Sequence, residues 1–116
     1  MSEISARLVH GFRGETVVLL SMDDYGLDRF RSVLTQVGMS LSTLTHGRTV
    51  HEFAMKDGDS EIVLLDGWVK WLFAPSKLVE VIEKLDAMKE ACGPCHQYVD
   101  ISTPARVLVL SLNEYV

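Results

Sequence analysis

The chain lacks long apolar runs, and it also lacks clusters of basic residues. None of its segments approaches the ~20 consecutive apolar residues that span a bilayer, and residues 1–13 lack the basic start and apolar stretch of a secretion signal. Lys and Arg number 11 against 16 Asp and Glu, for a net charge of −5. Without a basic patch the sequence does not favour nucleic-acid binding. We therefore expect a cytoplasmic protein that binds neither membrane nor nucleic acid.

Cysteine is scarce as well, with only Cys92 and Cys95 present. In a reducing cytoplasm these two residues are not expected to form a structural disulfide. The remaining composition, 47% hydrophobic and 23% charged, is that of an ordinary globular protein. A length of 116 residues predicts one domain that spans residues 1–116.

The hydrophobic patterns predict strands and helices in the order ββα, βββ, α, ββ. Strands are expected at residues 4–10, 16–22, 50–55, 61–65, 68–73, 97–102 and 106–112. The middle three read as a meander, whereas periodicity does not decide between loop and strand for residues 39–47. We expect an α+β fold, with a mostly antiparallel sheet and both helices packed on one of its faces.

Both predicted helices have start and stop signals. Asp23 and Asp24 are N-cap candidates for the first helix, which Gly38 would end. Its apolar stripe is Leu27, Phe30, Val33, Leu34 and Val37. The second helix opens at Pro75 and stops at Gly93-Pro94. Its apolar stripe is Leu78, Ile82, Leu85 and Cys92.

Two distant segments of the sequence look alike. Residues 17–25 and 107–115 match at four positions and are conservatively related at five. Internal duplication and convergence of two apolar strands that precede acidic residues both explain this echo.

The motif Cys92-Gly93-Pro94-Cys95-His96 resembles the thioredoxin active site and the attachment site of c-type haem. A thioredoxin nucleophile needs a helix N-terminus, but this motif follows a helix. Haem attachment needs export and, in common cytochromes c, a downstream axial Met, whereas all five methionines precede the motif. Cys92, Cys95 and His96 could supply three zinc ligands, without an evident fourth. We interpret Cys92 as a core residue and Gly93-Pro94 as a helix stop.

No other catalytic pattern is present. Gly-x-Ser-x-Gly, His-Glu-x-x-His and Walker sequences are absent. His46 and His51 are five positions apart, a spacing that separates them on a strand or a helix. We therefore expect a non-enzymatic protein that needs no cofactor. The alternative is a thiol- or metal-using protein centred on Cys92, Cys95 and His96.

Several strands are apolar on both faces, so one sheet face lacks cover from the two helices. The Asp66-Gly67 turn pairs Leu65 with Trp68, and Val69, Trp71 and Phe73 share the better core face. The opposite face would carry Trp68, Lys70, Leu72 and Leu65, which we expect to form a recognition or self-association surface. Alternatively, Trp68 covers the second sheet face within its own chain. A homodimer is expected, because an uncovered apolar face favours association.

The last third of the chain resembles small acidic immunity proteins of bacterial toxin systems. The resemblance rests on a helix that runs into Cys95-His96-Gln97-Tyr98-Val99-Asp100, followed by Val107-Leu108-Val109-Leu110-Ser111. It implies a non-enzymatic inhibitor that binds a cognate toxin, with Asp and Glu side chains that complement a basic cleft. No individual functional residue is carried over from that family.

Overall fold

The computed structural model describes residues 3–37, 42–91 and 93–115. These residues form β1 (Ile4–Phe12), β2 (Glu15–Met22), α1 (Asp24–Gln36), β3 (Ser42–His46), β4 (Thr49–Met55), β5 (Glu61–Leu65), β6 (Trp68–Phe73), α2 (Pro75–Glu90), β7 (Cys95–Asp100) and β8 (Val107–Leu112). The expected α+β class is confirmed. Residues 42–46, which periodicity left open, are a strand.

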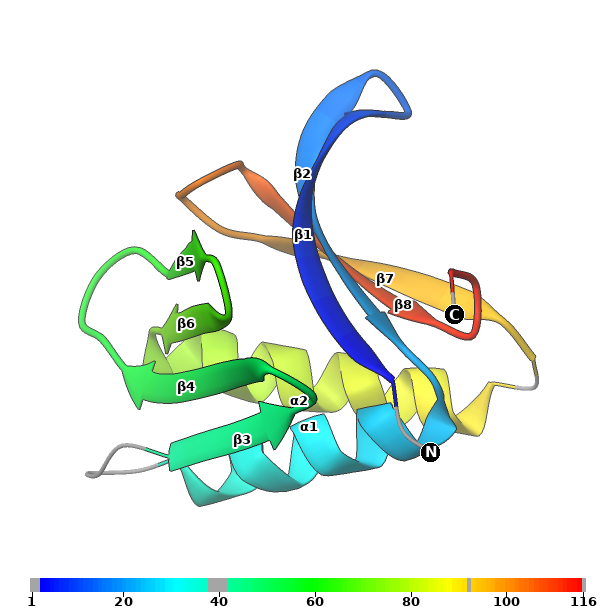
Figure 1. Cartoon of the computed structure of the whole chain (residues 1–116), viewed down its shortest axis with the longest axis horizontal. Helices are drawn as coiled ribbons and strands as arrows, with labels where there is room; N and C mark the ends of the chain where they lie inside the picture. Colours follow the sequence, from blue (N-terminus) through cyan, green and yellow to red (C-terminus); the bar gives the residue numbers. More distant parts are fainter. Residues whose placement is uncertain (1–2, 38–41, 92, 116) are drawn as a thin grey trace.

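The strands form two four-stranded sheets rather than one wide sheet. The strand order is β1-β2-β8-β7 in sheet A and β3-β4-β6-β5 in sheet B. Most pairs are antiparallel, but the central pair of each sheet, β2 with β8 and β4 with β6, is parallel. Figure 1 shows the two sheets splayed apart above a pair of helices.

The predicted meander of β4, β5 and β6 is wrong. The strand β6 lies between β4 and β5. After β4 the chain crosses to the edge position of β5, and the two-residue turn at Asp66-Gly67 then brings β6 back between them, parallel to β4. The inward side chains of β6 explain this central position. Val69, Trp71 and Phe73 are all buried and bring more apolar volume into the core than the other strands of sheet B.

Helix α1 begins where the sequence predicts. The Asp23 carboxylate accepts hydrogen bonds from the backbone N–H of Gly26 (2.7 Å) and of Glu3 (3.0 Å). Partial burial acts to raise the pKa of Asp23, but these two hydrogen bonds outweigh it and the pKa lies below its ordinary value. Asp23 therefore caps α1 and also ties it to the start of β1. The expected stop at Gly38 lies outside the described residues.

Helix α2 begins at Pro75, as predicted, and ends at Glu90. Its buried residues are Leu78, Val81, Leu85 and Met88, which follow the helical repeat. Leu78 and Leu85 confirm the predicted stripe, and Ile82 is partly buried at its margin. The prediction that Cys92 continues this stripe into the core lies outside the described residues.

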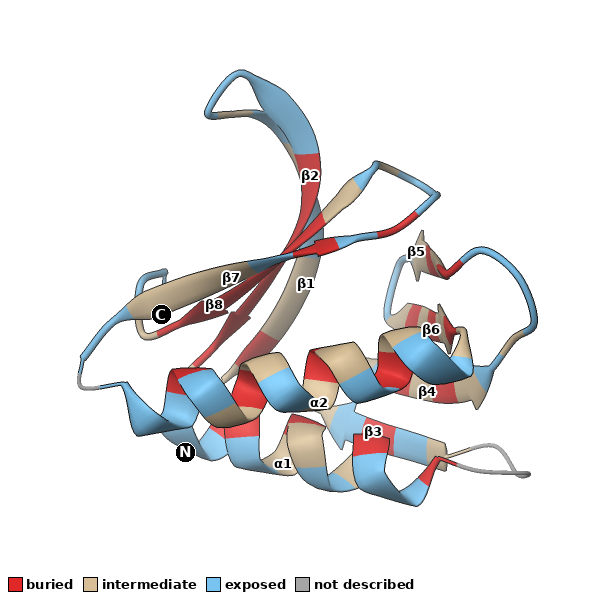
Figure 2. Cartoon of the chain, turned by 180° about the vertical axis from the view of Figure 1, so that it is seen from behind, coloured by how far each residue is buried: buried red, intermediate tan, exposed pale blue. Residues whose placement is uncertain are grey.

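One large core joins both sheets to both helices. The inward residues of sheet A, among them Val18, Leu20 and Leu110, belong to the same buried cluster as Phe53 and Trp71 of sheet B. Phe30 of α1 packs edge-on against these two rings, with centroids 5.1 and 5.0 Å away. In Figure 2 the buried residues of the helices face the sheets, whereas the tip of the β1–β2 hairpin is exposed. The core therefore lies between the helix pair and the two sheets.

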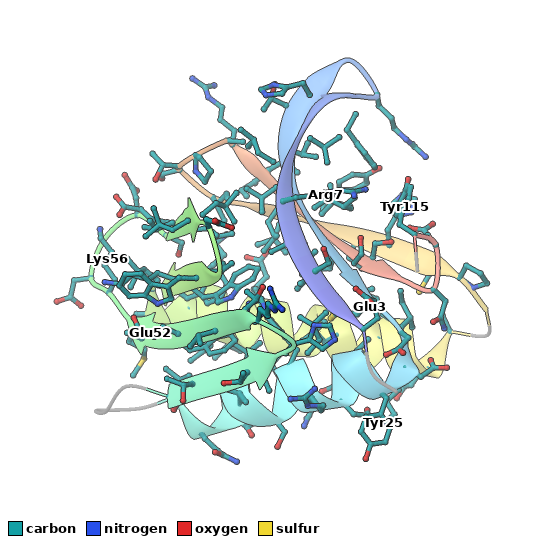
Figure 3. All side chains as sticks on the ribbon, viewed as in Figure 1. Glu3, Arg7, Tyr25, Glu52, Lys56 and Tyr115 are labelled. Atoms are coloured by element: carbon teal, nitrogen blue, oxygen red, sulfur yellow. The ribbon has the colours of Figure 1, made fainter. Side chains whose placement is uncertain are left out.

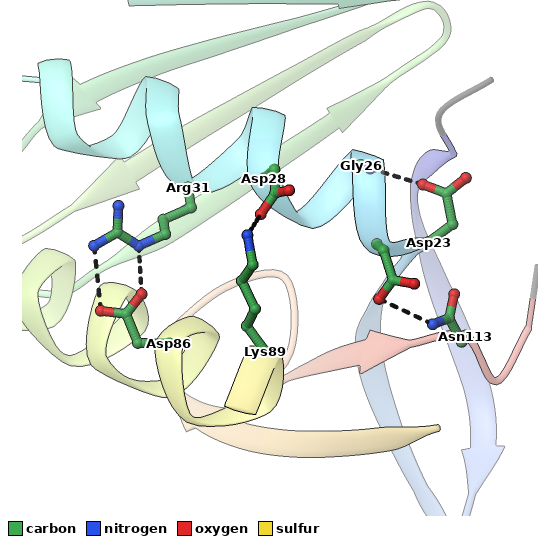
Figure 4. A network of polar contacts seen from close by, with 8 residues as sticks. Asp23, Gly26, Asp28, Arg31, Asp86, Lys89 and Asn113 are labelled. Atoms are coloured by element: carbon green, nitrogen blue, oxygen red, sulfur yellow. Dashed lines mark hydrogen bonds and ion pairs between the residues drawn. The ribbon is translucent and has the colours of Figure 1, made fainter. Parts of the chain in front are cut away.

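Two ion pairs connect the helices on their outer side (Figure 4). Arg31 of α1 pairs with Asp86 of α2 through two hydrogen bonds, and Lys89 of α2 pairs with Asp28 of α1. The bond to Asp86 raises the pKa of Arg31, and the bond to Arg31 lowers the pKa of Asp86. Since all four side chains are well exposed, these pairs orient the helices more than they stabilise them.

The chain contains two ββαββ units, and the exchange of hairpins between them gives the strand topology a twofold relationship. The order β1, β2, α1, β3, β4 is repeated by β5, β6, α2, β7, β8. Each sheet combines the first hairpin of one unit with the second hairpin of the other. Equivalent hydrogen bonds follow the central strands, since Asn113 N donates to Met22 O (2.8 Å) and Lys56 N donates to Phe73 O (3.0 Å). Strand β2 therefore corresponds to β6, and β4 corresponds to β8.

The echo between residues 17–25 and 107–115 does not follow this twofold relationship. Its strands, β2 and β8, are direct neighbours, paired in parallel so that Val18 lies opposite Leu108 and Ser21 opposite Ser111. Each residue from Val18 to Met22 thus lies beside its counterpart on β8, with the helices on one side of the sheet and the outer face on the other. A shared environment accounts for the likeness, whereas the structural repeat relates different strands.

Candidate functional site

The outward residues of sheet B form one continuous surface, called here the outer face of sheet B. Strand pairing assigns to it Thr43 and Thr45 of β3, Val50, Glu52 and Ala54 of β4, Glu61, Val63 and Leu65 of β5, and Trp68, Lys70 and Leu72 of β6. No other described element of the chain packs over this surface. All four residues predicted for a recognition surface, Trp68, Lys70, Leu72 and Leu65, lie on it together.

Trp68 lies at the centre of the apolar part of this face. Strand register places it between Leu65 on β5 and Val50 on β4, which are 51% and 37% exposed. The Trp68 side chain itself is partly exposed. The alternation predicted for β6 is confirmed, because Val69, Trp71 and Phe73 are buried on the opposite side. Trp68 is thus a large aromatic side chain that the fold leaves partly exposed.

The charged groups on this face neutralise one another. The Lys70 amine lies 4.6 Å from the centre of the Trp68 ring and 4.0 Å from the Glu52 carboxylate. Next to them, Lys56 lies 3.8 Å from Glu61. Figure 3 shows Glu52 and Lys56 on the sheet B side of the molecule. The face therefore combines exposed apolar groups with two carboxylates and two amines, although the whole chain carries a charge of −5.

The sequence prediction missed the half of this face that β4 provides. Val50, Glu52 and Ala54 are direct neighbours of Trp68, Lys70 and Leu72, respectively. A meander would have placed β4 on the far side of β5 and away from Trp68. The sequence pattern that could have indicated these residues is the alternation within β4, where the buried residues His51 and Phe53 separate the three outward residues.

The corresponding face of sheet A is largely covered by the chain itself. Val17, Leu19 and Val109 are buried there, and Val9, Phe12 and Val107 pack around them. Strand β1 has a register shift between Val9 and Phe12, and the β1–β2 hairpin curves beyond the body of the molecule (Figure 1). Sheet A therefore closes its second face partly by bending, whereas sheet B leaves its second face open.

A chain of four polar side chains also lies on this face of sheet A. Ser111 Oγ donates to Glu114 (2.7 Å), Glu114 accepts from His96 Nδ1 (2.9 Å), and His96 Nε2 lies 3.1 Å from the Tyr98 hydroxyl. Burial acts to raise the pKa of Glu114, but its bonds to Ser111 and His96 bring it below the ordinary value.

These four polar side chains do not have the geometry of a nucleophile–base pair. Ser111 is fully buried, so its hydroxyl is not available to attack a substrate, and it donates to the Glu114 carboxylate instead of to the imidazole. Its Tyr98 end borders a groove of about 330 Å³ formed with Phe12, Val17 and Val107. The sequence interpretation missed the cluster because Glu114 comes after β8 and Tyr98 follows the Cys motif that drew attention to His96.

The structure separates Cys95 from His96, the two potential ligands of the Cys92-Gly93-Pro94-Cys95-His96 motif that lie in the described residues. Cys95 and His96 are consecutive residues of β7 and point to opposite faces, so they do not converge on one metal ion. The Cys95 sulfur packs against the core, 3.7 Å from the carbonyl oxygen of Met88. Burial, and then the charge of Glu114, raises the pKa of its thiol. Cys92 lies outside the described residues.

The described ranges contain neither a cluster of metal ligands nor a helix that could span a membrane. Within residues 3–37, 42–91 and 93–115, no three His, Cys, Asp or Glu side chains gather as metal ligands. Neither of the two described helices has the length and apolarity needed to cross a membrane. Comparisons with protein-family models, curated proteins and solved structures found no match for the chain.

Proposed function

We propose that the chain is a non-enzymatic protein-binding domain whose docking surface is the outer face of sheet B. The observation that carries this proposal is the position of Trp68, partly exposed between Leu65 and Val50 on a sheet face that no described element covers. Large aromatic side chains that become buried on association contribute much of the energy of protein interfaces. Sheet A bends to cover its equivalent face, so the open face of sheet B is a specific feature.

The partner that this surface fits is a second copy of the chain. Two molecules with a charge of −5 repel each other, unless the contact excludes most of the unpaired carboxylates. On the outer face of sheet B each carboxylate lies next to an amine, Glu52 with Lys70 and Glu61 with Lys56. A twofold contact through this face therefore buries apolar surface without juxtaposing unpaired like charges.

Light scattering over a range of concentrations tests the proposal. The wild-type chain should form a dimer, and Trp68→Ala should weaken dimerisation by ~2 kcal/mol while barely changing the melting temperature of the monomer. Tyr25→Ala is the matched control, because Tyr25 is an exposed aromatic residue of α1, 67% accessible, away from this face. It should leave dimerisation unchanged.

Three outcomes would count against this assignment. A wild-type chain that stays monomeric at every concentration would exclude a second copy as the occupant. Loss of monomer stability in Trp68→Ala as large as in Trp71→Ala would place Trp68 in the core instead. Capture of a different protein through Trp68 by the monomer would assign the face to that protein.

The resemblance to immunity proteins favours a second binding role, separate from this docking surface, namely the inhibition of a bacterial toxin. The excess of carboxylates on the chain is the charge that a basic toxin cleft requires. In this role the chain would bind its target through acidic surface outside the neutral face of sheet B. Co-expression with the product of a neighbouring toxin gene tests it, because protection should survive Trp68→Ala if dimerisation and inhibition use different surfaces.

A further inference from the structure

The edge strands of the two sheets differ in how the chain covers them. The edges are β1 and β7 in sheet A and β3 and β5 in sheet B. The outward backbone groups of an edge strand have no neighbouring strand, and proteins usually block them. On two of these edges a helix side chain does so. Arg29 of α1 donates to the carbonyl oxygen of Thr45 on β3 (2.8 Å), and Lys84 of α2 donates to that of Tyr98 on β7.

Backbone pairing covers the edge of β5. The connection between β7 and β8 lies against this strand, where Ser102 N donates to Ser60 O and Ile62 N donates to Thr103 O, both over 2.9 Å. Strand β1 is the counterpart of β5 in the first unit. The corresponding β3–β4 connection has only two residues, and a cavity of about 300 Å³ lies between it and residues 3–6. Within the described residues, the edge of β1 has no such cover.

Ala6 and Leu8 direct their backbone N–H and C=O groups to this open edge. In an antiparallel pair every second residue bonds to the partner strand. Asp23 N donates to Glu3 O where the pairing of β1 with β2 begins, so the odd-numbered residues of β1 face β2 and the even-numbered ones face the edge. The same alternation holds on β2, because Met22 O accepts from the residue after β8 and not from β1.

The side chains along this edge are charged on one face and apolar on the other. Arg7, labelled in Figure 3, lies opposite Leu19 on the outer side of sheet A. It is exposed and has no ion-pair partner among the described residues. Leu8 lies on the inner side, opposite Val18, and is 38% exposed. Successive side chains of an added strand would lie beside Arg7 and Leu8 in turn.

A second copy of the chain fits this edge poorly. Residues 4–14 contain Arg7 and Arg13 and neither Asp nor Glu. If two β1 strands paired about a twofold axis through Ala6 and Leu8, the two Arg7 side chains would lie opposite or diagonal to each other on one face. Like charges in these positions destabilise strand pairing, and no carboxylate of the strand offsets them. The charge of the edge instead complements an acidic strand.

We propose that β1 is a docking edge for an extended segment of a partner protein, which adds a strand to sheet A. The segment carries a carboxylate beside Arg7 and an apolar side chain beside Leu8, and its backbone bonds to Ala6 and Leu8. The precedent within the molecule is the extended connection that bonds to β5. This docking edge does not depend on the outer face of sheet B, since β1 belongs to sheet A.

Titration of the full ¹⁵N-labelled chain with a synthetic peptide of alternating glutamate and valine, capped at both ends, tests the proposal by NMR. The peptide should slow amide hydrogen exchange at Ala6 and Leu8 and leave Arg7, whose amide already faces β2, unchanged. A peptide of alternating lysine and valine should bind more weakly. Arg7→Ala should weaken binding of the glutamate peptide about fivefold. Arg106→Ala is the matched control, because Arg106 is an exposed arginine on the β7–β8 connection, and it should bind like the wild type.

The charge-reversed variant Arg7→Glu gives the sharpest result, since it should bind the lysine peptide in preference to the glutamate peptide. Trp68→Ala should bind both peptides like the wild type, so the outcome is the same whether or not the chain dimerises through sheet B. Unchanged exchange at Ala6 and Leu8 with either peptide would overturn the proposal, and so would equal binding of the two peptides by the wild type. Slower exchange at higher chain concentration without peptide would assign the edge to a second copy instead.

Discussion

The indole N–H of Trp71 donates a hydrogen bond to Nδ1 of His51, 3.1 Å away, inside a core that is otherwise almost entirely apolar. This bond couples the central strand β6 to β4 across their parallel pairing, where Trp71 lies opposite Phe53 and Val69 opposite His51. Burial keeps the imidazole neutral by lowering its pKa, and a second proton would also remove the acceptor that Trp71 uses. Because protonation of His51 would break this hydrogen bond, the stability of the fold depends on pH.

We expect the protein to lose stability as the pH falls from 6.5 toward 4. In the folded state the pKa of His51 is lowered from 6.5 to about 4 by burial, so in this window the unfolded chain binds a proton that the folded chain does not. The stabilisation is fully present above pH 6.5, and up to about 3 kcal/mol is lost by pH 4. Urea unfolding at several pH values measures it.

The control for this measurement is His51→Gln, whose side-chain oxygen still accepts the Trp71 hydrogen bond but does not titrate. Its free energy of unfolding should change less over the same pH range, since only the carboxylates contribute. Equal pH dependence in the two proteins would show that His51 does not titrate abnormally.

Gly26→Ala should destabilise the fold strongly, although alanine is the better helix former. Gly26 is in the first turn of α1, where an added Cβ would lie 2.0 Å from the carbonyl oxygen of Glu3. The helix would have to move away from β1, at a cost of ~1–3 kcal/mol that outweighs the gain of up to ~1 kcal/mol in helix propensity. Thermal unfolding compares this variant with Ser32→Ala, at an exposed position of the same helix. An unchanged or raised melting temperature for Gly26→Ala would contradict the close approach.

Removal of the Asp23 carboxylate should cost more than loss of an ordinary helix cap. The carboxylate accepts from Gly26 in α1 and from Glu3 before β1, so Asp23→Ala leaves two N–H groups without their acceptor. We expect a loss of ~2 kcal/mol, at the upper end of the range for N-caps. Asp23→Asn, which keeps one acceptor oxygen, should recover part of it in denaturant unfolding. Equal losses in the two variants would argue against a role for the hydrogen bonds.

The Cys95 thiol should react slowly with iodoacetamide at pH 8. Its pKa is raised by burial and by the charge of Glu114, so little thiolate is present. In a Cys92→Ser background, mass spectrometry should show slower alkylation in buffer than in denaturant. Glu114→Gln should speed the reaction in buffer. Rapid alkylation of the folded chain would instead indicate an activated thiol and revive the alternative of a thiol-using protein.

Much of the local structure could be predicted from the sequence because its causes are local. Asp23 caps α1 and Pro75 opens α2, as their chemistry predicts. The two-residue turn at Asp66-Gly67 fixes the register between β5 and β6, which puts Trp68 and Trp71 on opposite faces. This register is why all four predicted surface residues share one face.

Only the tertiary structure decided which strands meet. The split into two sheets, the parallel pairs and the placement of β4 beside β6 depend on contacts between distant segments. Hydrophobic alternation assigns the faces of a strand but does not name its neighbours. Val50 and Glu52 could therefore be assigned to the candidate surface only from the tertiary structure. In the same way, only the strand pairing shows that His51 on β4 occupies the position that Leu108 has on β8, where an apolar residue is buried.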